Sequence, residues 1–313
     1  MAHDRRFRFG IQLARSPSGA DWAATAQRAE ELGYSTLLLP DHFGDQLAPI
    51  PAVMAAADAT TDLRVGTLVL DNDYRHPVVV AKEAATIDLL SGGRLELGVG
   101  AGWMTSDYEQ SGIPHDRPGV RIDRMVEGLQ ILKGLLEDEK PVSFTGEHYQ
   151  VTDAVGTPRP AQRPRPPILI GGGGPRILSV AGREADIVGI TASLTQGYID
   201  PSLGKNVTAD ATAEKIQWVK DAAGDRFDDI ELNVQVILTM VTDDREATAK
   251  GLAENFQLST EEALEVPQVL LGTVDEICDQ LVARRDQFGF SYVIVNDSGF
   301  EALAPVIDRL AGT

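Results

Sequence analysis

The alternation of apolar runs with helical segments between Arg64 and Gly102 constrains the fold of this chain more than any other feature. Two apolar runs of strand length, residues 65–70 and 95–100, flank a helical segment that begins at Pro77. Strands joined by such long crossovers lie parallel, so their carboxyl ends meet at one edge. The region therefore predicts a β/α unit of a parallel sheet.

The same alternation continues along the 313 residues. Amphipathic or apolar segments of helix length separate the strand-like runs, and no point is visible at which the strand order reverses. The chain is therefore predicted to be one α/β domain, residues 1–313, folded as a single (β/α)8 TIM barrel with insertion loops. The expected strands are 7–13, 36–39, 64–70, 95–100, 168–170, 187–190, 230–241 and 292–295.

Three segments are expected to lie outside the barrel proper. Residues 142–151 alternate about a glycine-containing turn and predict a surface hairpin. The loops 103–117 and 191–206 have low periodicity, and long loops at the end of a barrel frequently carry function. We expect specificity to reside in these two loops.

Charge limits the partners of this chain. Forty-seven acidic against 28 basic side chains give a formal net charge of -19, which repels nucleic acid and anionic lipid. No apolar stretch approaches the length of a membrane span, and Met1–Arg6 lead into no long apolar run. We therefore expect a cytoplasmic protein that acts on a small molecule.

A run of four glycines, Gly171–Gly174, follows the strand 168–170 and precedes Pro175. Such a turn leaves backbone amides free to meet an anion at a helix N-terminus. The alternative is a tight β/α turn that binds nothing. A Rossmann glycine motif is absent, because Arg176 and Trp103 occupy the places of the final glycine after the two glycine-rich segments.

Asp41 and His42 follow the second strand, where a barrel places catalytic groups. An imidazole can donate to a carbonyl group or carry a proton near neutral pH. A helix-capping aspartate and a packing histidine are the alternative, and the sequence leaves both open. The chain shows no metal-ligand spacing among its histidines and no hydrolase, kinase or zinc motif, so its chemistry is expected to belong to a cofactor.

Trp103, Met104 and Tyr108 come just after the fourth strand. Aromatic side chains there could line a pocket for a flat ring, or could pack beneath a loop. Both interpretations remain open.

Several motifs together resemble the luciferase-like superfamily, and within it the coenzyme F420-dependent oxidoreductases. The similarity runs in order from Phe9 to Ile190 and more loosely beyond. The motifs are residues 37–43 (LLLPDHF), 65–70 (VGTLVL), 75–77 (RHP), 94–103 (RLELGVGAGW) and 171–175 (GGGGP).

This resemblance implies a barrel that binds a deazaflavin or flavin at the carboxyl ends of its strands. His42 and Asp41 would be catalytic, with His42 beside the ring, and the bond between Leu68 and Val69 would match a cis peptide common in the family. The resemblance further implies cofactor contacts from His42, Leu68, Val69, Gly100, Gly102, Gly172, Gly173, Gly174, Pro175, Thr191 and Ser193.

Two departures from F420-dependent glucose-6-phosphate dehydrogenases bear on the substrate. Trp103 stands where those enzymes have an acidic residue, and no tryptophan follows Phe43 closely. Sugar-phosphate oxidation is therefore not expected. We expect a small apolar or aromatic substrate in a pocket formed by Trp103 and Phe43.

The leading hypothesis is F420-dependent hydride transfer, with substrate reduction favoured over oxidation. The first alternative keeps the fold but uses FMN and oxygen as a two-component monooxygenase. The second is a barrel that binds a cofactor without turnover. The resemblance also implies a homodimer.

Overall fold

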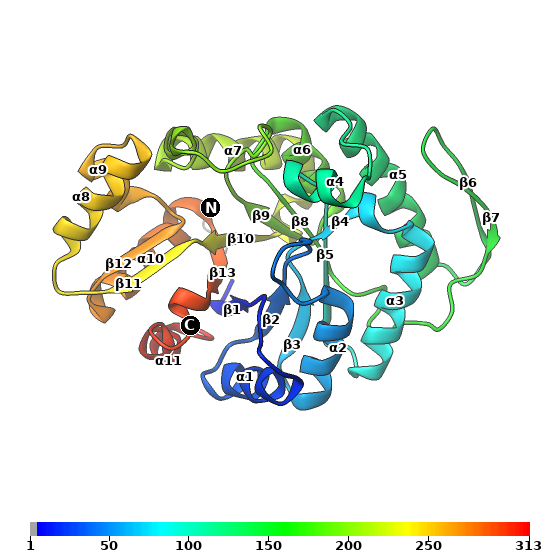
Figure 1. The fold of residues 1–313 in the computed structure, drawn as a ribbon, viewed down its shortest axis with the longest axis horizontal. Helices are drawn as coiled ribbons and strands as arrows, with labels where there is room; N and C mark the ends of the chain where they lie inside the picture. The colour runs from blue at the N-terminus through cyan, green and yellow to red at the C-terminus, as the bar shows by residue number, and fades with distance from the viewer. Residues whose placement is uncertain (1–4) are drawn as a thin grey trace.

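The computed structural model describes residues 5–313, so most of the N-terminal segment Met1–Arg6 lies outside the described residues. Within that range, eight parallel strands close into the predicted barrel (Figure 1). The closing contact pairs the third barrel strand with the fourth. The barrel strands are β1 (Arg8–Gln12), β2 (Thr36–Leu39), β3 (Arg64–Thr67), β5 (Leu95–Gly100), β8 (Ile168–Gly172), β9 (Ile187–Ile190), β10 (Glu231–Val236) and β13 (Phe290–Asn296).

A layer of helices surrounds the strands, because each crossover returns over the outside of the sheet (Figure 1). Proline supplies the first turn of several of them, and Thr273 and Glu276 form a capping box at the start of the helix Val274–Phe288. The outer helices are α1 (Gly19–Glu31), α2 (Pro49–Ala59), α3 (Pro77–Leu90), α5 (Pro118–Glu137), α6 (Pro175–Glu184), α7 (Ala209–Ala223), α10 (Val274–Phe288) and α11 (Ala304–Leu310).

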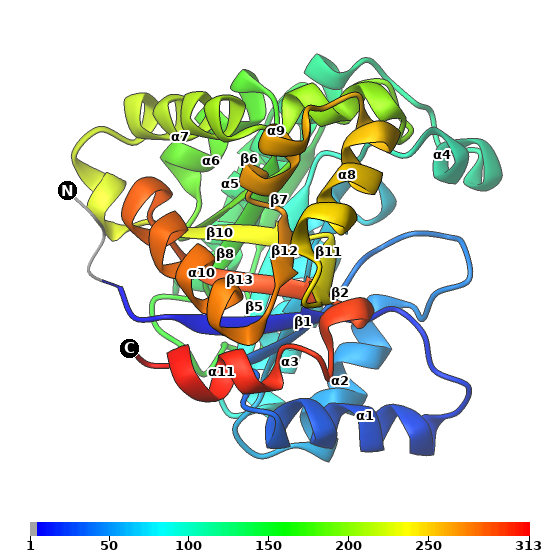
Figure 2. The same ribbon diagram turned by 90° about the vertical axis from the view of Figure 1, so that its left-hand side faces the viewer.

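Two predicted strands are not continuous. The run 64–70 breaks after Thr67, passes through a cis peptide between Leu68 and Val69, and resumes as β4 (Leu70–Asp71). The run 230–241 divides into β10 and β11 (Leu238–Val241). β11 leaves the barrel to pair with β12 (Val269–Gly272), and α8 (Arg245–Phe256) and α9 (Thr260–Glu265) pack against this pair (Figure 2). The prediction that each of these two runs forms one continuous strand was therefore wrong.

The surface elements agree in part with the sequence. The predicted hairpin is present as β6 (Val142–Thr145) and β7 (Gln150–Ala154), and it projects beyond α5 (Figure 1). The loop 103–117 contains a short helix, α4 (Thr105–Ser111), that the sequence analysis did not predict. The short 3-10 helices in the described part of the chain are η1 (Asn72–Tyr74), η2 (Pro201–Asn206), η3 (Gly224–Asp229) and η4 (Asp297–Gly299).

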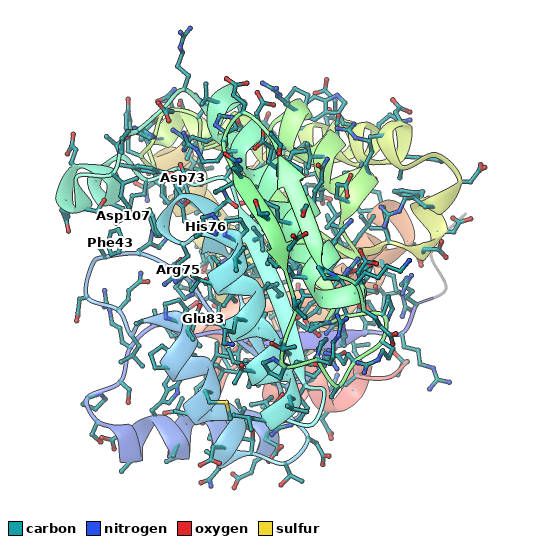
Figure 3. All side chains as sticks on the ribbon, turned by 90° about the vertical axis from the view of Figure 1, so that its right-hand side faces the viewer. Phe43, Asp73, Arg75, His76, Glu83 and Asp107 are labelled. Carbon is teal, nitrogen blue, oxygen red and sulfur yellow. The ribbon has the colours of Figure 1, made fainter. Side chains whose placement is uncertain are left out.

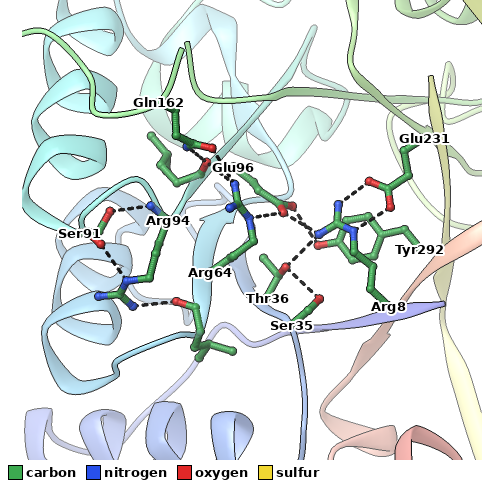
Figure 4. A network of polar contacts seen from close by, with 12 residues as sticks. Arg8, Ser35, Thr36, Arg64, Ser91, Arg94, Glu96, Gln162, Glu231 and Tyr292 are labelled. Atoms are coloured by element: carbon green, nitrogen blue, oxygen red, sulfur yellow. Dashed lines mark hydrogen bonds and ion pairs between the residues drawn. The ribbon is translucent and has the colours of Figure 1, made fainter. Parts of the chain in front are cut away.

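A buried ion network forms the floor of the barrel at the N-terminal ends of the strands (Figure 4). The Glu96 carboxylate, 1% exposed, accepts hydrogen bonds from Arg8 at 2.6 Å and Arg64 at 2.8 Å. The Tyr292 hydroxyl donates to its other oxygen at 3.1 Å, and Arg8 also pairs with Glu231. Burial opposes the charge of Glu96, but the two guanidiniums hold the pKa of this carboxyl below its ordinary value.

Above this floor the interior is apolar. Leu38, Leu169, Ile187 and Ile294 pack together around Tyr292 and form a cluster separate from the larger one between strands and helices. The polar network therefore closes one end of the barrel, and a binding site can form only at the other end. Among the described residues, no helix is long and apolar enough to cross a membrane.

We predict that Glu96→Gln lowers the free energy of unfolding by about 1–3 kcal/mol, because two half-buried guanidiniums lose the buried carboxylate that they share. Chemical denaturation at neutral pH measures this loss. Glu301→Gln is the matched control, since Glu301 meets Arg28 in an exposed pair. Equal, small changes in both variants would contradict a structural role for the floor network.

Candidate active site

The loops after the barrel strands gather at the carboxyl ends of the strands, opposite the ion network. The predicted residues 41–43, 68–69, 100–103, 171–175 and 191–193 all belong to these loops or to the last residues of the strands. One end of the barrel therefore collects every residue that the sequence analysis selected.

His42 is held by a carboxylate from a distant loop. Its Nδ1 lies 2.6 Å from Oδ2 of Asp107, which sits in α4. The His42 side chain is 20% exposed, whereas that of Asp107 is 3% exposed. The edge of the His42 ring meets Trp103, with ring centroids 5.7 Å apart. The pair places an oriented imidazole at the mouth of the barrel, with a carboxylate behind it.

Asp107 also organises the neighbours of His42. Its Oδ1 accepts the backbone N–H of Phe43 at 3.3 Å, and its Oδ2 accepts the hydroxyl of Tyr74 at 3.3 Å. The rings of Phe43 and Tyr74 pack with centroids 4.6 Å apart. Phe43 and Asp107 lie beside each other although they come from different loops (Figure 3). This carboxylate therefore ties three βα segments together.

Asp41 has a different environment from His42. Its side chain is 4% exposed and forms two hydrogen bonds with Arg75, at 2.5 and 3.1 Å. Its Oδ2 also accepts the backbone N–H of Asp71 at 3.1 Å. The carboxylate thus joins the second strand to the segment after β4, and its oxygens are occupied by the protein.

The segment around Leu68 and Val69 fits against β5 because that strand lacks side chains there. A Cβ on Gly100 would lie 2.6 Å from Cγ2 of Val69. The Leu68 carbonyl accepts a hydrogen bond from Nε2 of Gln12 at 2.8 Å. Oε1 of Gln12 accepts one from Nε2 of Gln235 at 2.6 Å. The sequence analysis missed this pair of glutamines, which alternation along β1 and β10 could have indicated.

Gly102 lies against a buried acidic pair. Its φ is +72°, and a Cβ there would lie 1.9 Å from the Tyr108 hydroxyl and 2.3 Å from Oδ2 of Asp71. The Tyr108 hydroxyl lies 3.1 Å from Asp71 and 3.0 Å from Asp73. It has a single proton, so it can donate to only one of these two carboxyl groups at a time. Burial, together with the charges of Asp73 and Asp41, raises the pKa of Asp71 to about 7. Tyr108 is therefore buried beneath the loop, as one of its two interpretations held.

The glycine run divides between strand and turn. Gly171 and Gly172 extend β8, and α6 begins at Pro175. A Cβ on Gly173 would lie 2.2 Å from the Ala192 carbonyl group and 2.4 Å from the Ser193 nitrogen, whereas a Cβ on Gly171 would meet nothing within 4 Å. The run therefore lets two loops approach closely and leaves space on its other side.

A buried lysine supports the loop that faces the glycines. Lys215 is 1% exposed, and its Nζ donates to the carbonyls of Thr191 at 2.8 Å and Asn206 at 2.5 Å. Asn206 Oδ1 accepts from the same Nζ and from the Ser193 backbone N–H at 2.6 Å. Burial lowers the pKa of Lys215 to about 8. The sequence analysis missed Lys215, because α7 shows an ordinary amphipathic pattern.

The residues present fit an anionic, ring-bearing cofactor. Backbone amides at the start of α6, which has no side-chain cap, can donate to a phosphate, and the side of Gly171 that meets no atom within 4 Å leaves room. His42 and Trp103 supply polar and flat apolar surfaces at the same mouth. Among residues 5–313, no group of three His, Cys, Asp or Glu side chains is placed to hold a metal ion.

These features define an α/β barrel with a polar and aromatic site at the carboxyl ends of its strands. A family model described as luciferase-like monooxygenase matches residues 6–277. The chain therefore belongs to the luciferase-like monooxygenase family, as the motifs indicated.

Individual relatives include two kinds of enzyme. The chain is 29% identical over 236 residues to an F420-dependent glucose-6-phosphate dehydrogenase of Amycolatopsis mediterranei (strain U-32), covering 72% of this chain and 67% of the relative. It is 29% identical over 254 residues to a 4-hydroxyprotoasukamycin monooxygenase of Streptomyces nodosus subsp. asukaensis, covering 79% and 64%. Both relatives are oxidoreductases by name.

The fold also has solved counterparts. The structure of a coenzyme F420 dependent tetrahydromethanopterin reductase from Methanopyrus kandleri superposes with a TM-score of 0.76 at 19% identity, covering 98% of this chain and 99% of that one. At this identity the similarity establishes the shared barrel. The predicted fold class is confirmed.

We predict that Gly173→Ala weakens binding of F420 by about tenfold or more, since the new Cβ forces apart the two loops that would hold the phosphate, at a cost above 1.4 kcal/mol. Equilibrium dialysis measures the affinity. Gly251→Ala is the control, because a Cβ there meets nothing within 4 Å. Unchanged affinity in Gly173→Ala would remove the glycine run from the cofactor site.

A second prediction concerns the pH dependence of stability. Because the pKa of Asp71 is raised to about 7 by burial, the folded protein holds a proton that the unfolded chain releases near pH 4. This stabilising contribution is complete below pH 4 and is lost as the pH rises through 7. Asp71→Asn should therefore gain melting temperature relative to the parent as the pH rises from 4 to 8. A difference that stays constant over this range would contradict a protonated Asp71.

Proposed function

We propose that this chain is an F420-dependent oxidoreductase that transfers a hydride between the deazaflavin and a small organic substrate. The observation that carries the proposal is the His42 imidazole, held by Asp107 at the same mouth as the glycine run. The F420-dependent relative named above supports the choice of cofactor. The cofactor would supply the hydride, and the protein would supply binding, orientation and a proton.

The residues divide this work by position. Gly172, Gly173 and Gly174 would hold the phosphate with backbone amides, and Thr191 and Ser193 would contribute from the facing loop. Lys215 would keep that loop in place and add positive charge in a chain of net charge -19. Backbone from Leu68, Val69 and Gly100 would border the ring.

We propose a small apolar or aromatic substrate. Trp103, half-buried, and Phe43, 44% exposed, are the aromatic side chains nearest to His42 in sequence or contact. His42 would orient the substrate and donate a proton in the direction of reduction. Asp41 would act on the site only through the backbone, because its carboxylate is bound to Arg75.

The assembly and setting of the protein also remain proposals. Exposed apolar side chains on α3, Val79, Leu89 and Leu90, support a homodimer. Light scattering after gel filtration tests this point. We keep the expectation of a cytoplasmic protein that binds neither nucleic acid nor membrane, on the basis of its charge.

A direct binding comparison tests the cofactor. The protein is titrated with F420 and, separately, with FMN, while quenching of tryptophan fluorescence is followed and dialysis confirms binding. Trp103 should account for the quenching if the ring lies at the mouth, so Trp103→Phe should remove most of the signal but retain binding. Preferential FMN binding with substrate-dependent oxygen uptake would instead support a two-component monooxygenase, in line with the second relative.

We predict that His42→Ala lowers kcat for hydride transfer from reduced F420 by on the order of 10²–10⁴, because it removes the oriented proton donor. Enones, imines and quinones are suitable trial substrates, and loss of reduced F420 is followed by absorbance. F420 affinity should change less than kcat. Full activity of His42→Ala would exclude this histidine from the reaction, and F420 binding without turnover on any substrate would favour a non-catalytic barrel.

A further inference from the structure

Asp107 is the buried acidic residue that contacts the His42 imidazole. Its oxygens receive the Nδ1 atom of His42 at 2.6 Å, the Phe43 N–H at 3.3 Å and the Tyr74 hydroxyl at 3.3 Å. The residue is 2% exposed. The Phe43 N–H is a donor and nothing else, and the tyrosine hydroxyl has its proton available, so the carboxylate acts as the acceptor. The remaining partner, Nδ1 of His42, must then carry a proton.

The helix that carries Asp107 is anchored independently. The next residue, Tyr108, is buried, and its hydroxyl contacts Asp71 at 3.1 Å and Asp73 at 3.0 Å. The guanidinium of Arg121 lies 5.5 Å from the centre of the Tyr108 ring, and His115 stacks on it at 4.4 Å. Tyr108 thereby fixes the position of α4. These contacts hold Asp107 next to His42 and do not involve His42 itself.

We infer that Asp107 is a positioning residue that sets the tautomer and orientation of His42. With Nδ1–H donating to Asp107, Nε2 is the nitrogen left to face the substrate. This inference rests on the proposed function for its catalytic meaning, although the tautomer is a property of the protein alone. It assigns a role to a residue 65 positions away from His42, outside every motif of the sequence analysis.

The proton step follows from this arrangement. In the direction of reduction, the Nε2–H bond of the imidazolium breaks and a bond forms between that proton and the substrate atom that gains negative charge when carbon receives the hydride. His42 is left neutral with its proton on Nδ1. Asp107 accepts the Nδ1–H hydrogen bond throughout and keeps the ring oriented. Solvent returns the proton to Nε2 after the product leaves.

Asp107→Asn is the informative variant, because it preserves shape but places an amide where the acceptor was. If the new side chain turns its N–H₂ toward the ring, Nδ1 becomes an acceptor and the proton moves to Nε2. We expect kcat to fall by on the order of 10²–10⁴ while the F420 affinity changes little. Glu109→Gln, an exposed position on the same helix, is the matched control and should retain the parent kcat.

The tautomer is read directly by ¹⁵N NMR of protein labelled at histidine, with the His42 signals assigned by their absence in His42→Ala. The parent should show neutral His42 protonated at Nδ1, and Asp107→Asn should shift it toward protonation at Nε2. Parent protein with the proton on Nε2 overturns the inference, even if Asp107→Asn does not fold. A parent-like kcat in Asp107→Asn does the same.

The outcomes separate this inference from the proposed function. Loss of activity in His42→Ala, together with an active Asp107→Asn, would retain the proposed function and reject the role of Asp107. Full activity in His42→Ala would reject the catalytic role of His42, while the NMR result would still decide what Asp107 does. Asp107→Glu, which keeps the acceptor, should recover the parent tautomer and part of the lost kcat.

Discussion

The close approach of β3 and β5 is the contact on which the rest of the barrel depends. A Cβ on Gly66 would lie 2.2 Å from the Glu96 carbonyl oxygen, and one on Gly98 would lie 2.0 Å from the Thr67 carbonyl oxygen. Glycine at these positions lets the two strands close the barrel. The same closure places the Glu96 side chain inside, between Arg8 and its other partners (Figure 4). At the opposite end it sets the segment after Thr67 against the mouth.

The two ends of the barrel consequently have different physical tasks. The floor buries the Glu96 carboxylate between two guanidiniums and thereby joins strands from distant parts of the chain. The aliphatic layer above it separates this network from the mouth. The mouth can then hold polar groups that are oriented by neighbouring loops. Asp107 is the clearest example, because its buried carboxylate, in the segment after β5, contacts His42 and Phe43 after β2 and Tyr74 after β4.

Part of the candidate site could be predicted because its residues stand at fixed places relative to the strands. His42 is the third residue after β2, and the glycine run begins immediately after the apolar residues of β8. Gly102 was predicted for another reason than the one the structure shows, since it makes room for Tyr108 and Asp71. Lys215 was not predicted, because its three acceptors belong to residues 9 and 24 positions away.

The sequence by itself determined the barrel, the order of its strands and the end at which the site lies. These properties follow from the local alternation of apolar and amphipathic segments, which each stretch of chain carries without reference to the others. Only the tertiary structure decided which loop faces which. Three features depend on contacts between segments far apart in the sequence: the break after Thr67, the departure of β11 from the barrel and the pairing of Asp107 with His42. Packing and hydrogen bonding between distant residues determine them, and a single sequence contains no periodic signal for such contacts.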